Sequence, residues 1–303
     1  MSRRIFSFMV FFSLVSSAAF AQSNLLNAKT PGEIGKKTAA QDSLDNDKPL
    51  PYGYVGDRDI LLGRKVWEVI DLNQRINFPM YFPVEDNLGP DRKPLYDVLT
   101  SAIREGKITE VYDDSYFTTK KSLKDIDASL SKIDTTDAGK EQMNSDLKAY
   151  RSGRKKISQE YINKTEIKAI DVSGYEVLGY WYFDKRQGEL KYRMLGIAPI
   201  VPDVYTMDKE EKDYIRIFWI YFPAARDVLH KVKAFNAENS AMAITFDHLL
   251  NSRRFSGNII REENVYGDRL IEEYMKDNAQ MQLLESERVK DKIRNFEQDM
   301  WNY

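Results

Sequence analysis

Hydrophobic positions recur along this chain at spacings that predict particular secondary structures. Between Leu95 and Ile103 the apolar residues repeat every three or four positions, which is the spacing of one helix face. Pro94 stands near the start of this segment and Gly106 just past its end, so a helix is expected to begin and stop there. A similar spacing, with Asp57 as a cap, predicts another helix over about 57–72.

Other segments read as strands. Apolar and polar residues alternate in Tyr175–Asp184 and in Leu190–Ile197, and the turn Lys185–Gly188 separates them. This pattern predicts a long β-hairpin over about 175–197. The run YIRIFWIYF at 214–222 is apolar on both faces, as in a central strand. The fold class predicted is α+β: an antiparallel sheet built around the hairpin and this strand, flanked by helices.

The last part of the chain predicts a long helix that starts near Asp268. Its apolar residues form one stripe: Leu270, Tyr274, Met281, Leu284, Val289, Ile293, Phe296 and Met300. Large side chains gather at its end, and four of them are candidate anchor or partner-contact residues: Phe296, Met300, Trp301 and Tyr303. Either they contact a partner or they dock on the subunit itself, and the stripe alone does not distinguish the two.

The beginning of the chain has the pattern of a secretory signal peptide. Arg3 and Arg4 precede an apolar run, and a small-residue site predicts cleavage after Ala21. Residues 22–56 contain few large apolar residues and predict an extended N-terminal arm. Residues 57–303 then form a single α+β domain, in which the highly charged segment 118–160 predicts one or two exposed helices.

Two segments of this domain resemble each other weakly in sequence. Trp67 is followed 30 residues later by Asp97, and Trp219 is followed 28 residues later by Asp247, with similar residues around each. Two related halves, about 57–165 and 166–303, would give a subunit similar faces at either end. Coincidence among common helix-ending residues is the alternative.

Composition narrows the class of protein. The sequence has 42% hydrophobic and 30% charged residues and no cysteine, which excludes disulfides, thiolate metal sites and a lipid-modified N-terminal cysteine. Removing the two arginines of the signal peptide changes the net charge from −2 to −4. A nucleic-acid partner would require a basic surface, so none is expected.

Candidate catalytic chemistry is sparse. The two histidines, His230 and His248, lie in no metal-binding or triad spacing. The acidic doublets Asp113–Asp114 and Glu262–Glu263 could supply the paired carboxylates of a periplasmic hydrolase, although adjacent acids usually decorate a turn. We expect no catalytic residue, no metal site and no cofactor.

A second alternative rests on the aromatic knot, which we define as Phe78–Pro83. Its two Phe-Pro pairs, with Tyr81 between them, predict a turn-rich aromatic cluster. Such a cluster could form the pocket of a small-molecule-binding module, could pack on its own domain, or could contact a partner.

Three separated blocks carry a resemblance to a known family. The first, Lys65–Asp114, contains Trp67, the aromatic knot and the segment PLYDVLTSAIREGKI; the others are TFDHLLNSRRFSGNIIREENVY and LLESERVKDKIRNFEQDMWNY. In this order they resemble the GldN/PorN family of the type IX secretion and gliding motility machinery of Bacteroidetes. The resemblance runs from about Lys48 to Tyr303.

This resemblance implies a non-enzymatic structural component of the periplasm. Its implied partners are a ring lipoprotein of the GldK/PorK type, the periplasmic domain of a GldM/PorM-type inner-membrane motor protein, and copies of itself in a ring. Association with the inner side of the outer membrane would then be indirect, through the lipoprotein.

Overall fold

The computed structural model describes residues 30, 48–84, 93–145, 158–207, 209–235, 244–276 and 278–301. By its internal contacts the chain divides into Met1–Lys48 and Pro49–Tyr303, and all of the described helices and strands lie in the second unit. The predicted signal peptide and cleavage site lie outside the described residues.

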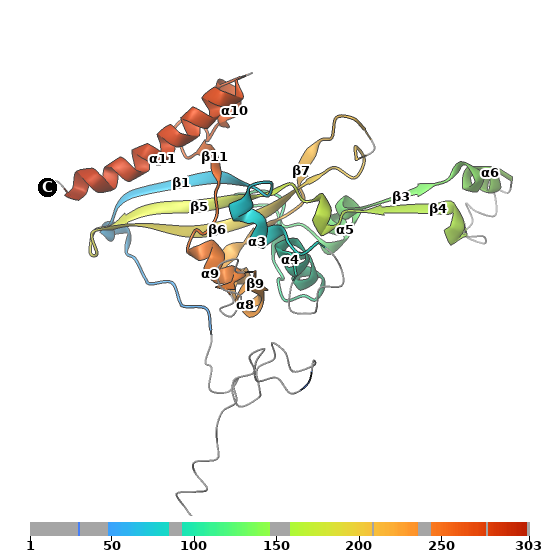
Figure 1. The fold of residues 1–303 in the computed structure, drawn as a ribbon, viewed down its shortest axis with the longest axis horizontal. Helices are drawn as coiled ribbons and strands as arrows, with labels where there is room; N and C mark the ends of the chain where they lie inside the picture. Colours follow the sequence, from blue (N-terminus) through green and yellow to red (C-terminus); the bar gives the residue numbers. More distant parts are fainter. Residues whose placement is uncertain are drawn as a thin grey trace, which may run out of the picture. The chain divides into compact units, whose positions relative to one another are not determined.

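An antiparallel sheet forms the centre of the second unit, with its strands in the order β11–β1–β5–β6–β8–β2 and with β7 also paired to β6 (Figure 1). The strands are β1 (Ile60–Asp71), β2 (Val111–Tyr112), β5 (Gly174–Asp184), β6 (Glu189–Pro202), β7 (Tyr214–Arg216), β8 (Trp219–Tyr221) and β11 (Asn258–Glu262). The predicted hairpin is confirmed as β5 and β6, and Gly188 in its turn has φ +66°.

Two predictions about this sheet were incomplete or wrong. The segment expected to be a helix over 57–72 is strand β1, preceded by the short 3₁₀ helix η2 (Asp57–Asp59). β1 lies between β5 and β11, and its consecutive residues Val66, Trp67 and Glu68 are all buried. Burial on both faces removes the alternation that would mark a strand in the sequence. The run 214–222 is divided into β7 and β8 and ends where a helix begins at Phe222.

Four helices cover one face of the sheet and enclose the main core: α3 (Phe78–Tyr81), α4 (Leu95–Arg104), α8 (Phe222–Lys231) and α9 (Phe246–Asn251). The helix predicted over 95–103 is therefore confirmed, and Gly106 after it has φ +70°. Residues such as Leu99, Phe222 and Phe246 are fully buried against strand residues such as Ile197. Nearby lie the short pair β9 (Lys233–Ala234) and β10 (Ile244–Thr245), and the 3₁₀ helices η3 (Arg75–Asn77) and η5 (Ala169–Asp171).

A two-stranded arm is formed by β3 (Ser131–Thr135) and β4 (Ile162–Glu166), apart from the main sheet (Figure 1). Helices α5 (Leu123–Leu130) and α6 (Asp137–Ser145) and the 3₁₀ helix η4 (Gln159–Tyr161) belong to the same region. The helices predicted in 118–160 are thus present, but α5 is only partly exposed because Ile126 and Leu130 are buried in the main core. The sequence did not predict the strands β3 and β4. No residue of β3 or β4 is buried, so their sequences lack the alternation of apolar and polar residues that marks a strand.

The order of the sheet has an internal correspondence. β1 flanks β5 and β8 flanks β6, on either side of the central hairpin. Each of these two strands leads into a helix that starts with Phe-Pro, then a second helix, then an outer strand. The outer strands are exchanged, because β2 follows β1 but pairs with β8, and β11 follows β8 but pairs with β1.

The C-terminal segment forms α10 (Ile271–Tyr274) and then α11 (Ala279–Trp301). The long helix is confirmed, but it starts at Ala279 and not near Asp268. Val289 and Ile293 of α11 pack with Val66 and Ile259 in a second, smaller core, so the middle of this helix is fixed on the sheet. Among the described residues, no helix is both long and apolar enough to cross a membrane.

Candidate interaction surfaces

A cleft of about 700 Å³ lies between the strap, which we define as the extended segment Pro49–Val55, and the body of the domain. Tyr52 of the strap is stacked between two guanidinium groups, with Arg226 at 4.3 Å and Arg193 at 4.5 Å from the ring centre. Its hydroxyl donates a 2.7 Å hydrogen bond to Asn251 Oδ1. Burial raises the pKa of this tyrosine, so it stays neutral and its ring serves as an anchor.

Both histidines line this cleft, but the carboxylate beside them has another role. His230 Nδ1 lies 3.6 Å from Asp247 Oδ2. The Asp247 carboxylate also accepts hydrogen bonds of 2.8 and 3.2 Å from Arg226, and it is 6% exposed. This ion pair connects α8 to α9, and removing either partner would leave a buried charge uncompensated. In the described ranges, no group of three potential ligands is placed to hold a metal ion.

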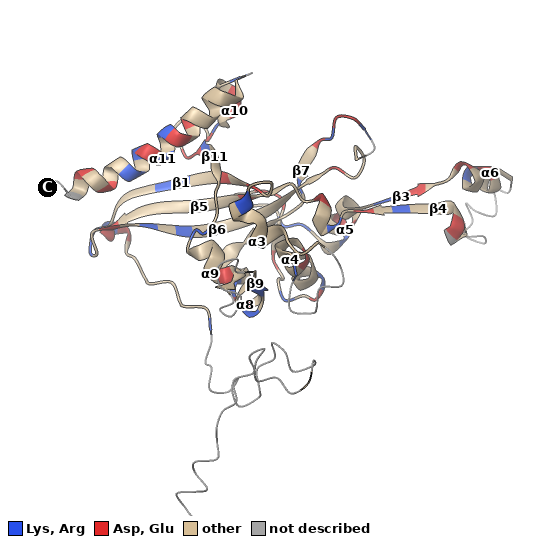
Figure 2. Cartoon of the chain, viewed as in Figure 1, with Lys and Arg blue, Asp and Glu red and all other residues tan. Residues whose placement is uncertain are grey.

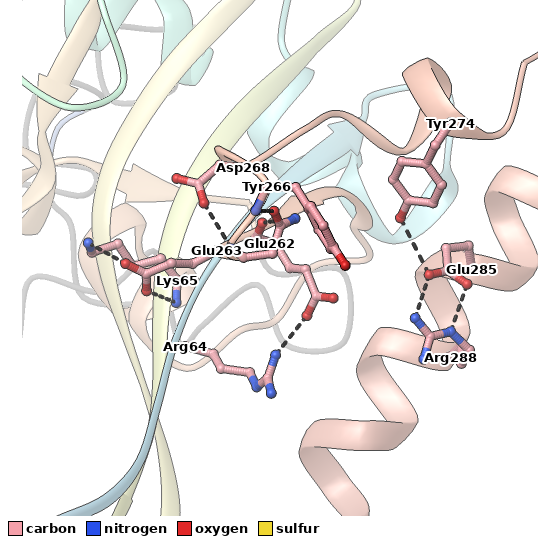
Figure 3. A network of polar contacts seen from close by, with 10 residues as sticks. Arg64, Lys65, Glu262, Glu263, Tyr266, Asp268, Tyr274, Glu285 and Arg288 are labelled. Carbon is pink, nitrogen blue, oxygen red and sulfur yellow. Dashed lines mark hydrogen bonds and ion pairs between the residues drawn. The ribbon is translucent and has the colours of Figure 1, made fainter.

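The acidic doublets form separate ion pairs and turns. Glu262 pairs with Arg64 and Glu263 with Lys65, each at 2.9 Å, which connects β11 to β1 (Figure 3). Each carboxylate is therefore neutralised by a strand neighbour. These two acids hold an edge of the sheet in place.

Asp114 of the other doublet organises its own turn. Its carboxylate accepts hydrogen bonds from the backbone N–H groups of Tyr116, Thr118 and Thr119 and from the Thr118 hydroxyl. Burial opposes ionisation of this group, but the hydrogen bonds outweigh it and the pKa of Asp114 is lowered. Asp113 pairs with Lys121 at 2.9 Å. Neither doublet is arranged as a free carboxylate pair.

A buried ion pair between Arg253 and Glu68 was not predicted from the sequence. The carboxylate of Glu68, on β1, is 1% exposed and accepts two hydrogen bonds from the guanidinium of Arg253. That guanidinium also lies 4.3 Å from the ring centre of Tyr192 and 4.8 Å from that of Trp181. No local sequence pattern indicated this pair, because its two residues are 185 positions apart in the sequence.

The aromatic knot packs on itself at the surface. The rings of Phe78 and Phe82 meet edge to face at 5.3 Å, and Tyr81 meets Phe82 at 4.8 Å. Tyr81 also donates a hydrogen bond to the backbone oxygen of Ile170. Phe78, Phe82 and Ile170 remain partly exposed, so the knot presents an apolar surface.

The four candidate anchor residues at the C-terminal end of the chain differ in their contacts and in how far the structure describes them. Phe296 meets the ring of Phe183 at 5.8 Å, and its neighbour Glu297 accepts a hydrogen bond from the Leu190 backbone N–H. Met300 is half-buried. Trp301 is the last residue of α11, its side chain is not described, and Tyr303 lies outside the described residues. Up to Glu297, then, α11 contacts its own domain.

The first turns of α11 carry the most exposed part of the predicted stripe. Tyr274, Met281 and Leu284 are all substantially exposed, and we call these three residues the α10–α11 surface. The Tyr274 hydroxyl donates a 3.4 Å hydrogen bond to Glu285, which brings α10 beside this part of α11 (Figure 3). The apolar spacing was visible in the sequence, but not that this end of the stripe would lie uncovered.

Charges of both signs are interspersed over the described elements, including α11 (Figure 2). On this helix Arg288 pairs with Glu285, Lys290 with Glu287 and Arg294 with Asp291. Arg294 and Asp291 are both exposed, and such a pair contributes little stability. Glu285 is only 11% exposed, so its pair with Arg288 is partly buried.

These features define an α+β protein whose buried carboxylates Glu68 and Asp247 are held in structural ion pairs and whose aromatic knot and α10–α11 surface expose apolar side chains. The sequence profile described as "Gliding motility associated protein GldN" matches residues 55–302, and the chain belongs to this family. The family is associated with gliding motility and is not a known enzyme family. No curated protein matches the chain.

Proposed function

We propose that this chain is a non-enzymatic structural subunit of a periplasmic type IX secretion and gliding motility complex, in which it assembles into a ring with a lipoprotein of the GldK/PorK type. Membership in a gliding motility family supports the motility role. The observation that carries the assembly role is the α10–α11 surface, because exposed clustered apolar side chains on a folded domain mark contact sites.

The location follows from the same proposal. The chain is exported by its N-terminal segment, cleaved after Ala21, and held at the inner side of the outer membrane by the lipoprotein. The periplasmic domain of a GldM/PorM-type motor protein is its further partner. Mass spectrometry of the N-terminal peptide of the mature protein from a periplasmic extract checks the cleavage site, and a retained Met1 contradicts it.

The internal correspondence of the sheet supports assembly with copies of itself. The turns after β2 and β11 are alike: the side chains of Asp114 and Asn264 each accept a hydrogen bond from the backbone N–H two residues later, at Tyr116 and Tyr266. Each turn then returns to its strand through an isolated bridge. We infer two related halves, which give one subunit similar edges at β2 and β11 for head-to-tail contacts.

The test is co-expression with the lipoprotein, followed by light scattering of the purified complex. The native chain is expected to yield a mass far above that of one heterodimer. Replacing Met281 and Leu284 together by serine is expected to reduce that mass while the isolated subunit stays folded, because these side chains bury little area within it. Tyr205→Ser is the control, since Tyr205 is also exposed but lies on another part of the surface. An unchanged mass for the double variant would contradict the role of this surface.

A further inference from the structure

We propose that the cleft beside the free edge of β6 is a binding site for an extended peptide with acidic side chains. The proposal rests on the cleft alone and does not depend on ring assembly. Three features carry it: an unpaired stretch of strand, a surplus of positive charge in the lining, and a bound segment of this chain that shows how the site holds a backbone.

The first feature is the strand edge. β6 pairs with β5 along Glu189–Met194 and again from Gly196, with Leu195 unpaired where the register shifts, whereas β8 joins its other side only at Gly196 and Ile197. Within the described part of the chain, no strand pairs with Glu189–Leu195 on that other side. An exposed strand edge presents unpaired N–H and C=O groups and can accept an additional strand.

The direction of these groups follows from one contact. The Leu190 N–H donates to Glu297 at the end of α11 and therefore points away from β5. Because alternate residues of an antiparallel strand point their N–H groups to the same side, the N–H groups of Tyr192 and Met194 face the same edge. They are the positions that a bound strand would use.

The second feature is the charge of the lining. Four basic residues line the cleft, namely Arg186, Lys191, Arg193 and Arg226, together with two acidic ones, Asp184 and Asp247. The basic side chains of the lining thus outnumber the acidic ones by two. Both acids are already paired, with Arg186 and Arg226. Lys191 has only a 3.8 Å contact with the exposed Glu189, and no carboxylate of the described residues pairs with Arg193. Acidic side chains would neutralise this surplus.

The third feature is the strap. Arg193 donates a 3.0 Å hydrogen bond to the backbone oxygen of Gly53, and Arg186 donates one of 3.0 Å to that of Tyr54. The cleft thus already holds one extended segment by its carbonyl oxygens and by the ring of Tyr52. A further volume of about 700 Å³ remains, within the range of ~300–1,000 Å³ typical of ligand sites.

The experiment uses the mature full-length chain and a fluorescein-labelled octapeptide of alternating glutamate and valine residues. Binding is followed by fluorescence anisotropy, with the lysine–valine counterpart as the comparison peptide. The acidic peptide is expected to bind about tenfold more tightly than the basic one, and more weakly as salt is raised. Equal affinity for the two peptides would overturn the proposal.

Lys191→Glu reverses a lining charge without removing a contact to the strap, so it should weaken binding of the acidic peptide about tenfold. Lys191→Arg should retain binding. Lys164→Glu, an equivalent reversal on the remote strand β4, is the matched control and should leave affinity unchanged. Loss in the control variant equal to that in Lys191→Glu would show non-specific attraction and refute the site.

Hydrogen exchange distinguishes pairing of the peptide backbone with β6 from binding of an anion through its charge alone. The acidic peptide should slow exchange in the segment 190–195, since its backbone would cover those N–H groups. Citrate at the same carboxylate concentration should not. Protection by citrate, or none with a bound acidic peptide, would contradict the pairing with β6.

Discussion

The guanidinium of Arg253 donates two hydrogen bonds of 2.9 Å to the carboxylate of Glu68, although the residues are 185 positions apart. Arg253 follows α9 and has φ +51°, a conformation uncommon for a residue other than glycine. The hydrogen bonds to Glu68 therefore help to hold Arg253 in a backbone conformation that is unfavourable for a residue other than glycine. The pair fixes the end of α9 against the middle of β1.

Removing one partner of this pair should be strongly destabilising. Arg253→Ala leaves the Glu68 carboxylate buried without its cation, and such a loss costs about 3–5 kcal/mol of unfolding free energy. Urea unfolding at neutral pH measures it. Arg294→Ala, which removes the exposed pair with Asp291, should change stability by less than ~1 kcal/mol. A similar loss in both variants would show that burial of the Glu68 pair is not the cause.

The strap should be released when the tyrosine anchor is removed. Tyr52→Ala removes the ring beside Arg193 and Arg226, and faster cleavage by an added protease is expected in Pro49–Val55. Tyr52→Phe keeps the ring and loses only the hydrogen bond to Asn251, so it should lie between the native chain and Tyr52→Ala. Equal protection in all three would contradict the anchoring role of the ring.

Stability should be sensitive to acid through Asp114. Its folded-state pKa lies below the ordinary value of about 3.9, so the ionised form stabilises the fold above that value. This contribution is lost as the pH falls through the folded-state pKa. Asp114→Asn should therefore be less stable than the native chain at neutral pH, and the difference should shrink in acid. Thermal unfolding across a pH series measures this, with Asp137→Asn, which alters the exposed pair with Lys140, as the control.

The middle of α11 should matter more to stability than its first turns. Ile293→Ala removes a side chain that is 3% exposed and should cost about 2–5 kcal/mol. Met281→Ala removes one that is 45% exposed and should cost far less. If both cost the same in chemical unfolding, the described docking of α11 is wrong.

Truncation after Arg294 tests the end of the same helix. It removes Phe296 with its contact to Phe183, and also Glu297 with its hydrogen bond to Leu190. Burial of one large apolar side chain is worth about 1.5–3 kcal/mol, so the isolated subunit should melt at a lower temperature. An unchanged melting temperature combined with loss of lipoprotein binding would assign this end to a partner instead.

The sequence alone determined the elements whose signals are local. Alternation and the turn ending in Gly188 specified the central hairpin, and the apolar spacing between Pro94 and Gly106 specified α4. The three blocks of residues also sufficed to indicate the family. In each case the information lies within a short segment, where backbone preference and side-chain periodicity agree.

Only the tertiary structure decided the remaining features. Strand β1 carries the spacing of a helix, and it is a strand because β5 and β11 pair with it on both sides. The exchange of β2 and β11, the pair between Arg253 and Glu68, and the exposed start of α11 depend on contacts between distant segments. Pairing and burial at such distances leave no periodic trace in the sequence, because the partner that satisfies each residue lies elsewhere in the chain.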